Sequence, residues 1–259
     1  MDLGIRGRTA IVCASTSGLG RACAEALAAE GVMLVINGRS TDTAAQTAKE
    51  MADRFGVDAL GVAADLNDAE GRARLVGMCP DPDILVTNNA GPPPAGFLDV
   101  DAAAWQAALQ ANMLSAIELV QAVLPGMRAR RFGRIVNITS AMVKTPHAFM
   151  TPSVAARAGL TGVMKAVARD VVSDNVTINN LLPERIDTGR QRQMAELAVA
   201  IRGITLEEAY AEIAATIPAG RLGRPEEVGA ACAFLCAEGS GYLTGQNLQL
   251  DGGAYEGLV

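Results

Sequence analysis

Residues 9–20 read TAIVCASTSGLG, an apolar run that passes directly into a turn containing Gly18 and Gly20. The apolar part predicts a buried strand over 9–14, and the residues that follow predict a helix over 20–30. A glycine-rich turn between a strand and a helix lets a phosphate group approach the backbone amides at the helix N-terminus. This stretch therefore predicts the opening unit of a nucleotide-binding α/β fold.

The rest of the chain repeats this alternation of short apolar strands and longer helical segments. The strands are continuously apolar, which is typical of a parallel sheet that is covered on both faces. We expect one domain over residues 1–259, a single Rossmann-type, doubly wound parallel sheet flanked by helices. Further strands are predicted at 32–37, 59–64, 84–88, 133–139, 176–181 and 247–250, and helices at 43–55, 68–78, 101–127, 154–172 and 225–236.

One segment departs from the alternation, because residues 188–218 are polar and helical and lie between the sixth strand and the last helix. Within this segment, Thr205 and Glu208 have the spacing of a capping box, which predicts a helix start. We expect the insertion, at about 188–218, to form a helical lid over a pocket.

The composition narrows the class of protein. The chain is 50% hydrophobic and has a formal net charge of -6 without a basic stripe, so nucleic acid is not an expected partner. Its five cysteines include no Cys-x-x-Cys pair, and we expect buried thiols and no metal site. The N-terminus has no signal-peptide pattern and no uncharged apolar run reaches about 18 residues, so a cytoplasmic protein with no membrane partner is expected.

The end of the second strand bears on the choice of cofactor. A site that selects NAD usually has an acidic residue there for the ribose 2′-hydroxyl. This chain has Arg39 instead, and a guanidinium suits a 2′-phosphate. The sequence therefore predicts NADP(H) rather than NAD(H). Asp65 ends the third strand, where it can also serve as a cap for the next helix.

Several segments together resemble the short-chain dehydrogenase/reductase family, most closely its 3-oxoacyl-carrier-protein-reductase-like branch. They are Asn88-Asn89-Ala90-Gly91, then Ser140 followed by Ser153-Val154-Ala155-Ala156-Arg157, and the tail segments 218–228 and 244–253. The resemblance covers nearly the whole chain. It also shows departures: Ser153 and Arg157 stand at the family's Tyr and Lys positions, Ala14 at its first glycine, and Glu184 at the glycine beside the nicotinamide.

The resemblance implies a dinucleotide cofactor, a small-molecule carbonyl or alcohol substrate, and a homo-oligomer, in this family a tetramer. It implies that Asn112 and Ser140 keep the roles of the family's catalytic asparagine and substrate-orienting serine. Asp65 would contact the adenine ring and Arg157 the cofactor ribose. The residues implied to bind the cofactor are Ser15, Ser17, Gly18, Leu19, Gly20, Arg39, Asp65, Leu66, Asn89, Ala90, Gly91, Arg157 and Pro183.

The resemblance leaves the proton transfer open. A tyrosine has a pKa of about 10 that a nearby cation can lower, whereas the aliphatic hydroxyl of Ser153 is a far weaker acid. His147, on the loop after Ser140, belongs to a residue type that titrates near neutral pH. Glu184 can act as an acid if it is desolvated. Each also has an ordinary interpretation, as a surface histidine and as a carboxylate that pairs with Arg157 or Arg185 or faces solvent.

We therefore expect an NADP(H)-dependent oxidoreductase that interconverts a carbonyl and an alcohol with a non-standard proton donor. Ser140 and Ser153 would hold the carbonyl oxygen. Two alternatives stay open: a non-redox enzyme that uses His147 or Glu184 as a base, and a catalytically silent nucleotide-binding protein on the same fold.

Overall fold

The computed structural model describes residues 2–258, which contain one parallel sheet with the strand order β3-β2-β1-β4-β5-β6-β7. The strands are β1 (Thr9–Val12), β2 (Met33–Gly38), β3 (Ala59–Ala63), β4 (Ile84–Thr87), β5 (Gly133–Ile138), β6 (Val176–Pro183) and β7 (Asn247–Leu250). The chain runs outward from β1 to β3, then crosses over and continues from β4 to β7. This is the doubly wound order, so the predicted fold class is confirmed.

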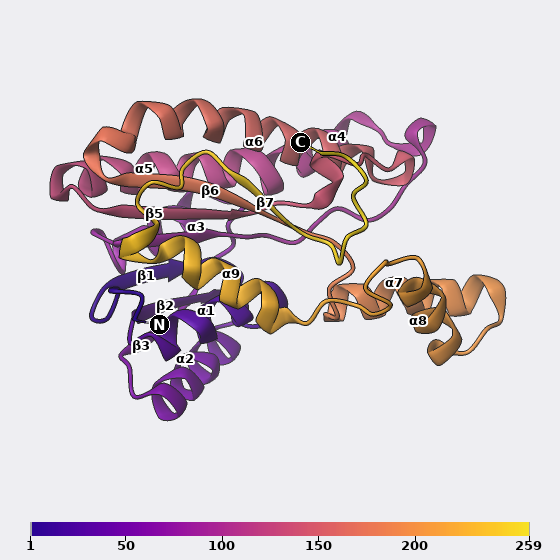
Figure 1. Ribbon diagram of the computed structural model, residues 1–259, viewed down its shortest axis with the longest axis horizontal. Coiled ribbons are helices and arrows are strands. Elements are labelled where there is room, and N and C mark those ends of the chain that lie inside the picture. Colours follow the sequence, from indigo (N-terminus) through magenta and orange to yellow (C-terminus); the bar gives the residue numbers. More distant parts are fainter. Residues whose placement is uncertain (1, 259) are drawn as a thin grey trace.

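Helices cover both faces of this sheet (Figure 1). One core lies under α1, α2 and α9, and the other under α3, α5 and α6. Successive residues of one strand enter different cores, as Ile135 and Val136 of β5 do, which explains the continuously apolar strands. The helices on the two faces are α1 (Gly18–Ala29), α2 (Thr41–Phe55), α3 (Ala69–Gly77), α5 (Ser115–Arg130), α6 (Thr151–Val171) and α9 (Pro225–Cys236).

The helix predicted over 101–127 is interrupted. The structure has α4 (Ala102–Leu109), a π-helical turn (Gln110–Leu114) and then α5, which ends at Arg130. The carbonyl of Ala111 accepts hydrogen bonds from Ser115 Oγ and Asn89 Nδ2, and side chains that enter the backbone ladder in this way favour a widened turn. Sequence periodicity does not report such a turn, because the apolar face continues on both sides of it.

The whole stretch Ala102–Arg130 is long and apolar enough to cross a membrane by length and composition alone. Its α5 part uses that apolar character within the fold, since Leu119, Val123 and Met127 are buried in the second core.

The predicted insertion contains two helices, α7 (Gly189–Arg202) and α8 (Leu206–Ala215). The capping box of Thr205 and Glu208 is present at the start of α8, as predicted. Figure 1 shows the pair, in orange, projecting from the body of the fold next to the ends of the strands.

Candidate active site

The turn after β1 presents backbone amides at the start of α1. Ser17 is the N-cap of this helix and makes no side-chain capping bond, so the first amides of α1 remain available to a ligand. Gly18 has a φ of 56°, in the left-handed region. A Cβ at Gly20 would lie 2.3 Å from the carbonyl oxygen of Ala14. The turn therefore requires both glycines that the sequence singled out, and Leu19 lies between them.

Ala14 in the same turn has a φ of 45°, a conformation that favours glycine. Its amide donates to Asn37 Oδ1 at 2.9 Å. Asn37, at the end of β2, also donates its backbone amide to Ser15 Oγ at 2.9 Å, and the Ser15 hydroxyl donates to the Val12 carbonyl. Ser15 is thus fully buried and its side chain supports the loop from within. Sequence reasoning missed Asn37, although a polar residue at the end of an apolar strand is a signal for such a role.

The candidate residues after β2 and β3 differ in the interactions that their side chains make. Arg39 is exposed and forms no ion pair within residues 2–258. Asp65 does not cap the next helix; Asp68 is the N-cap of α3, and Asp65 Oδ1 accepts the amide of Asn67 at 2.9 Å. Leu66 beside it is buried.

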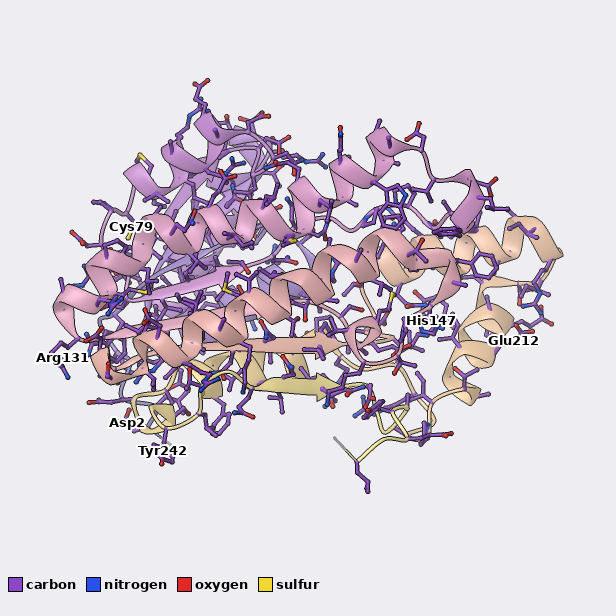
Figure 2. The ribbon with its side chains drawn as sticks, turned by 90° about the horizontal axis from the view of Figure 1, so that it is seen from above. Asp2, Cys79, Arg131, His147, Glu212 and Tyr242 are labelled. Carbon is purple, nitrogen blue, oxygen red and sulfur yellow. The ribbon has the colours of Figure 1, made fainter. Side chains whose placement is uncertain are left out.

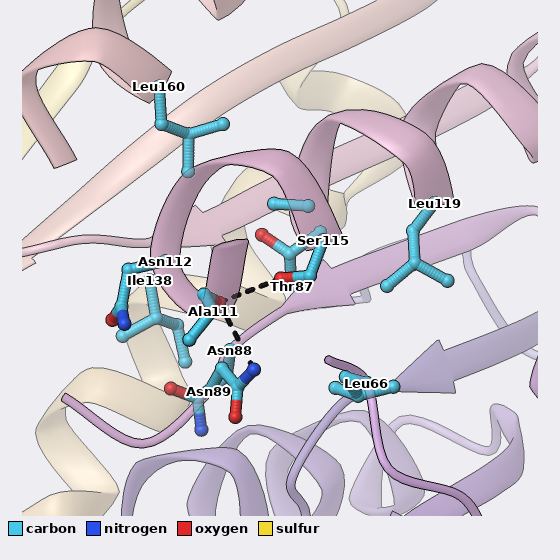
Figure 3. A pocket seen from close by; sticks show the side chains of 11 residues that line it. Leu66, Thr87, Asn88, Asn89, Ala111, Asn112, Ser115, Leu119, Ile138 and Leu160 are labelled. Atoms are coloured by element: carbon cyan, nitrogen blue, oxygen red, sulfur yellow. Dashed lines mark hydrogen bonds between the residues drawn. The ribbon is translucent and has the colours of Figure 1, made fainter. Parts of the chain in front are cut away.

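The segment after β4 meets the π-helical turn. Asn112 is 8% exposed and its Nδ2 donates to the carbonyl of Ala90 at 3.1 Å. Figure 3 shows Asn89 and Ser115 both directed at Ala111, whose carbonyl they share. A cavity of about 20 Å³ lies between these residues and the core, enough for one water molecule. The structure therefore brings Asn112 into contact with the segment Asn88-Asn89-Ala90-Gly91.

Ser153 and Arg157 lie on the first turns of α6, against the end of β5. The guanidinium of Arg157 donates through Nη1 to Ser153 Oγ and through Nε to the carbonyl of Thr139 at 3.2 Å. Ser153 is 2% exposed. Ser140 follows Thr139, and its Oγ accepts the amide of Met142. Arg157 thus joins the Ser153 hydroxyl on α6 to the end of β5, next to Ser140 in the chain.

Arg157 is a partly buried cation without a carboxylate partner among the described residues. Burial, and to a smaller extent the positive charge of Arg190, lowers the pKa of its guanidinium to about 10. Its Nη2 lies 3.4 Å from the position of a Cβ at Gly91, so the guanidinium faces the segment after β4. Such a cation is suited to stabilising negative charge on a ligand.

The loop after Ser140 and the end of β6 bring His147 and Glu184 together. His147 Nε2 lies 3.5 Å from Glu184 Oε1, and Arg185 Nε lies 3.8 Å from the same oxygen. Glu184 thus pairs with His147 and Arg185 rather than with Arg157. It follows the buried Pro183, and Arg185 has a left-handed φ of 52°. Figure 2 shows His147 near the start of α6, on the side of the molecule that carries α7 and α8.

Two residues of the insertion contact the site region. Arg190 Nη2 donates to the carbonyl of Pro92 at 2.8 Å, which ties α7 to the loop after β4. Tyr210 of α8 donates to Asp187 Oδ1 at 3.4 Å, beside a hollow of about 420 Å³ between α7 and α8. Sequence reasoning did not single out Arg190, and nothing in its polar, helical surroundings marks it.

Comparisons with known proteins agree with this architecture. The family model described as enoyl-(acyl carrier protein) reductase matches residues 13–255. The chain is 32% identical to the 3-oxoacyl-[acyl-carrier-protein] reductase FabG of Aquifex aeolicus, over 98% of this chain and 100% of that protein. It is 30% identical to the NADPH-dependent reductase BacG of Bacillus subtilis, over 97% and 99%. The crystal structure of L-sorbose reductase from Gluconobacter frateurii, complexed with NADPH and L-sorbose, superposes with a TM-score of 0.95 at 30% identity, covering 100% of both chains.

Proposed function

Because the chain belongs to the short-chain dehydrogenase/reductase family, in its 3-oxoacyl-[acyl-carrier-protein]-reductase-like branch, we propose that it is an oxidoreductase that uses NADP(H) to interconvert a carbonyl and an alcohol. The relatives named above that bind or depend on NADPH are similar over nearly their whole length, which supports the cofactor. The observation that carries the proposal is the turn after β1, whose geometry depends on Gly18 and Gly20 and leaves helix amides free for a pyrophosphate.

The described residues fit such a dinucleotide. The amides of residues 17–20 would bind the pyrophosphate, with Ser15 holding the turn from inside. Arg39, exposed and without an ion pair in residues 2–258, would bind the 2′-phosphate that distinguishes NADP from NAD. Asp65 and Leu66 would line the adenine side, and the segment Asn89, Ala90 and Gly91 would line the middle of the cofactor. Arg157 and Pro183 would border the nicotinamide end.

The chemistry would take place between β5, β6 and α6. The bound cofactor supplies a hydride to the carbonyl carbon. Ser140 and Ser153 would hold the carbonyl oxygen, and the Arg157 cation would stabilise the negative charge that develops on it. Asn112 would act on the segment after β4, whose Ala90 carbonyl it binds. Because Ser153 and Arg157 replace the family's tyrosine and lysine, the proton would come from a non-standard donor.

The insertion would serve as a lid. Its α7 is tied to the loop after β4 by Arg190, and Tyr210 on α8 is tied to Asp187, which follows β6. A lid attached at both sides of the crevice would exclude water when substrate is bound. A homotetramer is the expected assembly, and the exposed apolar side chains Phe234, Tyr242 and Leu248 near the edge strand β7 are consistent with a contact between copies.

The first experiment is a calorimetric titration of the purified protein with NADPH and, separately, with NADH. We expect binding that is tighter for NADPH. NADPH oxidation is then followed with two simple carbonyl probes, diacetyl and ethyl acetoacetate, for the wild type and for Ser140→Ala. Loss of an oxyanion-binding group should reduce turnover about 10²–10³-fold. Absence of binding for both cofactors would reject the proposal, and binding without turnover would favour the catalytically silent alternative.

A further inference from the structure

His147 and Glu184 lie close together beside the proposed reaction site. Their side chains are 41% and 16% exposed, and the distance from Nε2 to Oε1 is 3.5 Å. His147 Nε2 is inaccessible to solvent and makes no hydrogen bond with any group in residues 2–258. Nε2 is the ring nitrogen that faces Glu184, so Nδ1 is the nitrogen left to exchange a proton with a ligand.

The pair also lies at the correct edge of the sheet. His147 is on the loop that connects β5 to α6, between Ser140 and Ser153, and Glu184 directly follows β6. In a doubly wound sheet, ligands bind at the carboxyl ends of the strands. A hydrogen bond from the amide of Ala95 to the carbonyl of Phe149 joins the His147 loop to the loop after β4. His147 therefore lies at the same carboxyl edge of the sheet as Arg157 and the two serines.

We propose that His147, oriented by Glu184, is the acid that protonates the substrate oxygen in this enzyme. The inference rests on the proposed function, which requires a proton donor that Ser153 does not supply. A carboxylate at one nitrogen of an imidazole fixes the ring and its tautomer and leaves the other nitrogen to transfer a proton. Here Glu184 would accept from Nε2–H, and Nδ1–H would face the substrate.

The step balances without any further reactant. As hydride reaches the carbonyl carbon, the π bond of the carbonyl breaks and its electron pair stays on oxygen. The Nδ1–H bond of the imidazolium breaks, and an O–H bond forms on the substrate. His147 is left as the neutral Nε2–H tautomer, still held by Glu184, and it regains a proton from water. In the direction of alcohol oxidation, the neutral ring takes the proton.

Arg185 and Lys144 are charged side chains that lie on the same two loops as the pair. Arg185 Nε lies 3.8 Å from Glu184 Oε1 and shares that carboxylate with His147. Lys144, on the same loop as His147, lies over the ring of Tyr255 at 5.0 Å. Arg157 and Glu184 form no ion pair with each other in the described part of the chain. If the pH dependence of activity changes in His147→Asn, the other charged groups that could cause the change are Glu184, Arg185 and Lys144.

The activity test compares His147→Asn and Glu184→Met with the wild type, using NADPH and diacetyl. We expect kcat for reduction to fall about 10²–10⁴-fold in His147→Asn, the range for loss of a positioned acid, and less in Glu184→Met. Affinity for NADPH should not change. Glu212→Gln is the matched control, because Glu212 pairs with Arg202 on the exposed surface of the insertion, and it should behave as wild type.

A rescue variant separates proton donation from a structural role. Ser153→Tyr with Arg157→Lys restores the family's own donor, so adding His147→Asn to this pair should cause little further loss. The pH profile should change as well. Reduction by the wild type should follow the pH dependence of an imidazole acid, and reduction by the double variant that of a phenol. The double variant should keep its activity to higher pH.

A second readout does not depend on turnover. His147 is the only histidine of the chain, so the ¹⁵N resonances of its ring report one site and distinguish the two neutral tautomers. We expect the Nε2–H tautomer in the wild type and a mixture in Glu184→Met. An unchanged tautomer, or full turnover in His147→Asn, would overturn the inference while leaving the proposed function intact. Failure of the wild type to bind NADPH would instead reject the proposed function.

Discussion

The two halves of the candidate site, at the carboxyl ends of the strands, are built by different means. At the ends of β1 to β4, the ligand-facing surface is mostly backbone: the turn of Gly18 and Gly20, the free amides of α1, and the segment after β4. At the ends of β5 and β6, the surface consists of charged and hydroxyl side chains, including Arg157, Ser153 and the His147–Glu184 pair.

The difference shows how each region tolerates change. A backbone surface is fixed by steric limits, so its sequence is constrained at the few positions where a Cβ would collide. The residues of a side-chain surface can be substituted while the fold stays the same, because the conformation of the main chain does not depend on them. The first region would thus keep its dinucleotide while the second exchanges one proton donor for another. Substitutions in the two regions should therefore have different signatures.

The strongest way to break the backbone surface is Gly20→Ala. The added Cβ would lie 2.3 Å from the Ala14 carbonyl oxygen, a backbone atom that cannot swing aside. A cost of about 3 kcal/mol, the upper part of the range for overpacking, corresponds to about 150-fold in NADPH affinity. Calorimetry with NADPH measures the loss. Gly162→Ala in α6 is the control, because nothing lies within 4 Å of its added Cβ, and it should bind NADPH as the wild type does.

A smaller effect is expected from Arg39→Ala, which tests an exposed side chain of the backbone region. Loss of a charge-assisted contact to the 2′-phosphate of about 1.5–2 kcal/mol should weaken NADPH binding about 10–30-fold. NADH binding should be unaffected, because NADH has no phosphate at that position. Parallel titrations with the two cofactors decide the point. Equal weakening of both would show that Arg39 supports the loop and does not read the phosphate.

These two regions were also predictable to different degrees. Residues 9–20 predict the backbone region because its physical requirement, glycine in a tight turn, is local in sequence. The π-helical turn at Asn112 depends on Asn89 and Ser115 bonding to one carbonyl, and no local pattern encodes that. The pairing of His147 with Glu184 depends on two loops that meet only in the folded chain. Both residues could be named from the sequence, but their contact could not.

The turn after β1 also contains a residue that weakens it. Ala14 adopts a φ of 45°, which costs an L-residue roughly 1–2 kcal/mol, partly offset because glycine would be more flexible in the unfolded chain. Ala14→Gly should therefore raise the free energy of unfolding by about 0.5–1 kcal/mol in urea denaturation. Ala155→Gly, at an exposed helical position of α6, is the matched substitution and should lower it by about 1 kcal/mol. Destabilisation by both would mean that Ala14 is not strained.

The smallest effect concerns the charges of the side-chain region. Burial, and then the positive charge of Arg190, lowers the pKa of Arg157 to about 10. A cation whose folded-state pKa is lowered costs stability while it is charged in the folded state, and this cost begins to fall as pH rises above about 10, where the folded state loses the proton that the unfolded chain still holds. Arg190→Gln removes both this repulsion and the hydrogen bond from Arg190 to the Pro92 carbonyl. The part of the change that depends on the charge of Arg157 should favour the variant at neutral pH by about 0.2–1 kcal/mol, the scale of an interaction that involves an exposed charge.

The difference in unfolding free energy between Arg190→Gln and the wild type should then shrink as pH rises through about 10, because Arg157 becomes neutral in the folded state of the wild type. Urea denaturation at a series of pH values measures it. Arg192→Gln is the control on the same helix: Arg192 pairs with Glu196, so its removal should give a difference without this pH dependence. A constant difference for Arg190→Gln would show that the two guanidinium groups do not interact. The charge of Arg157 would then cost the folded state the same free energy with or without Arg190.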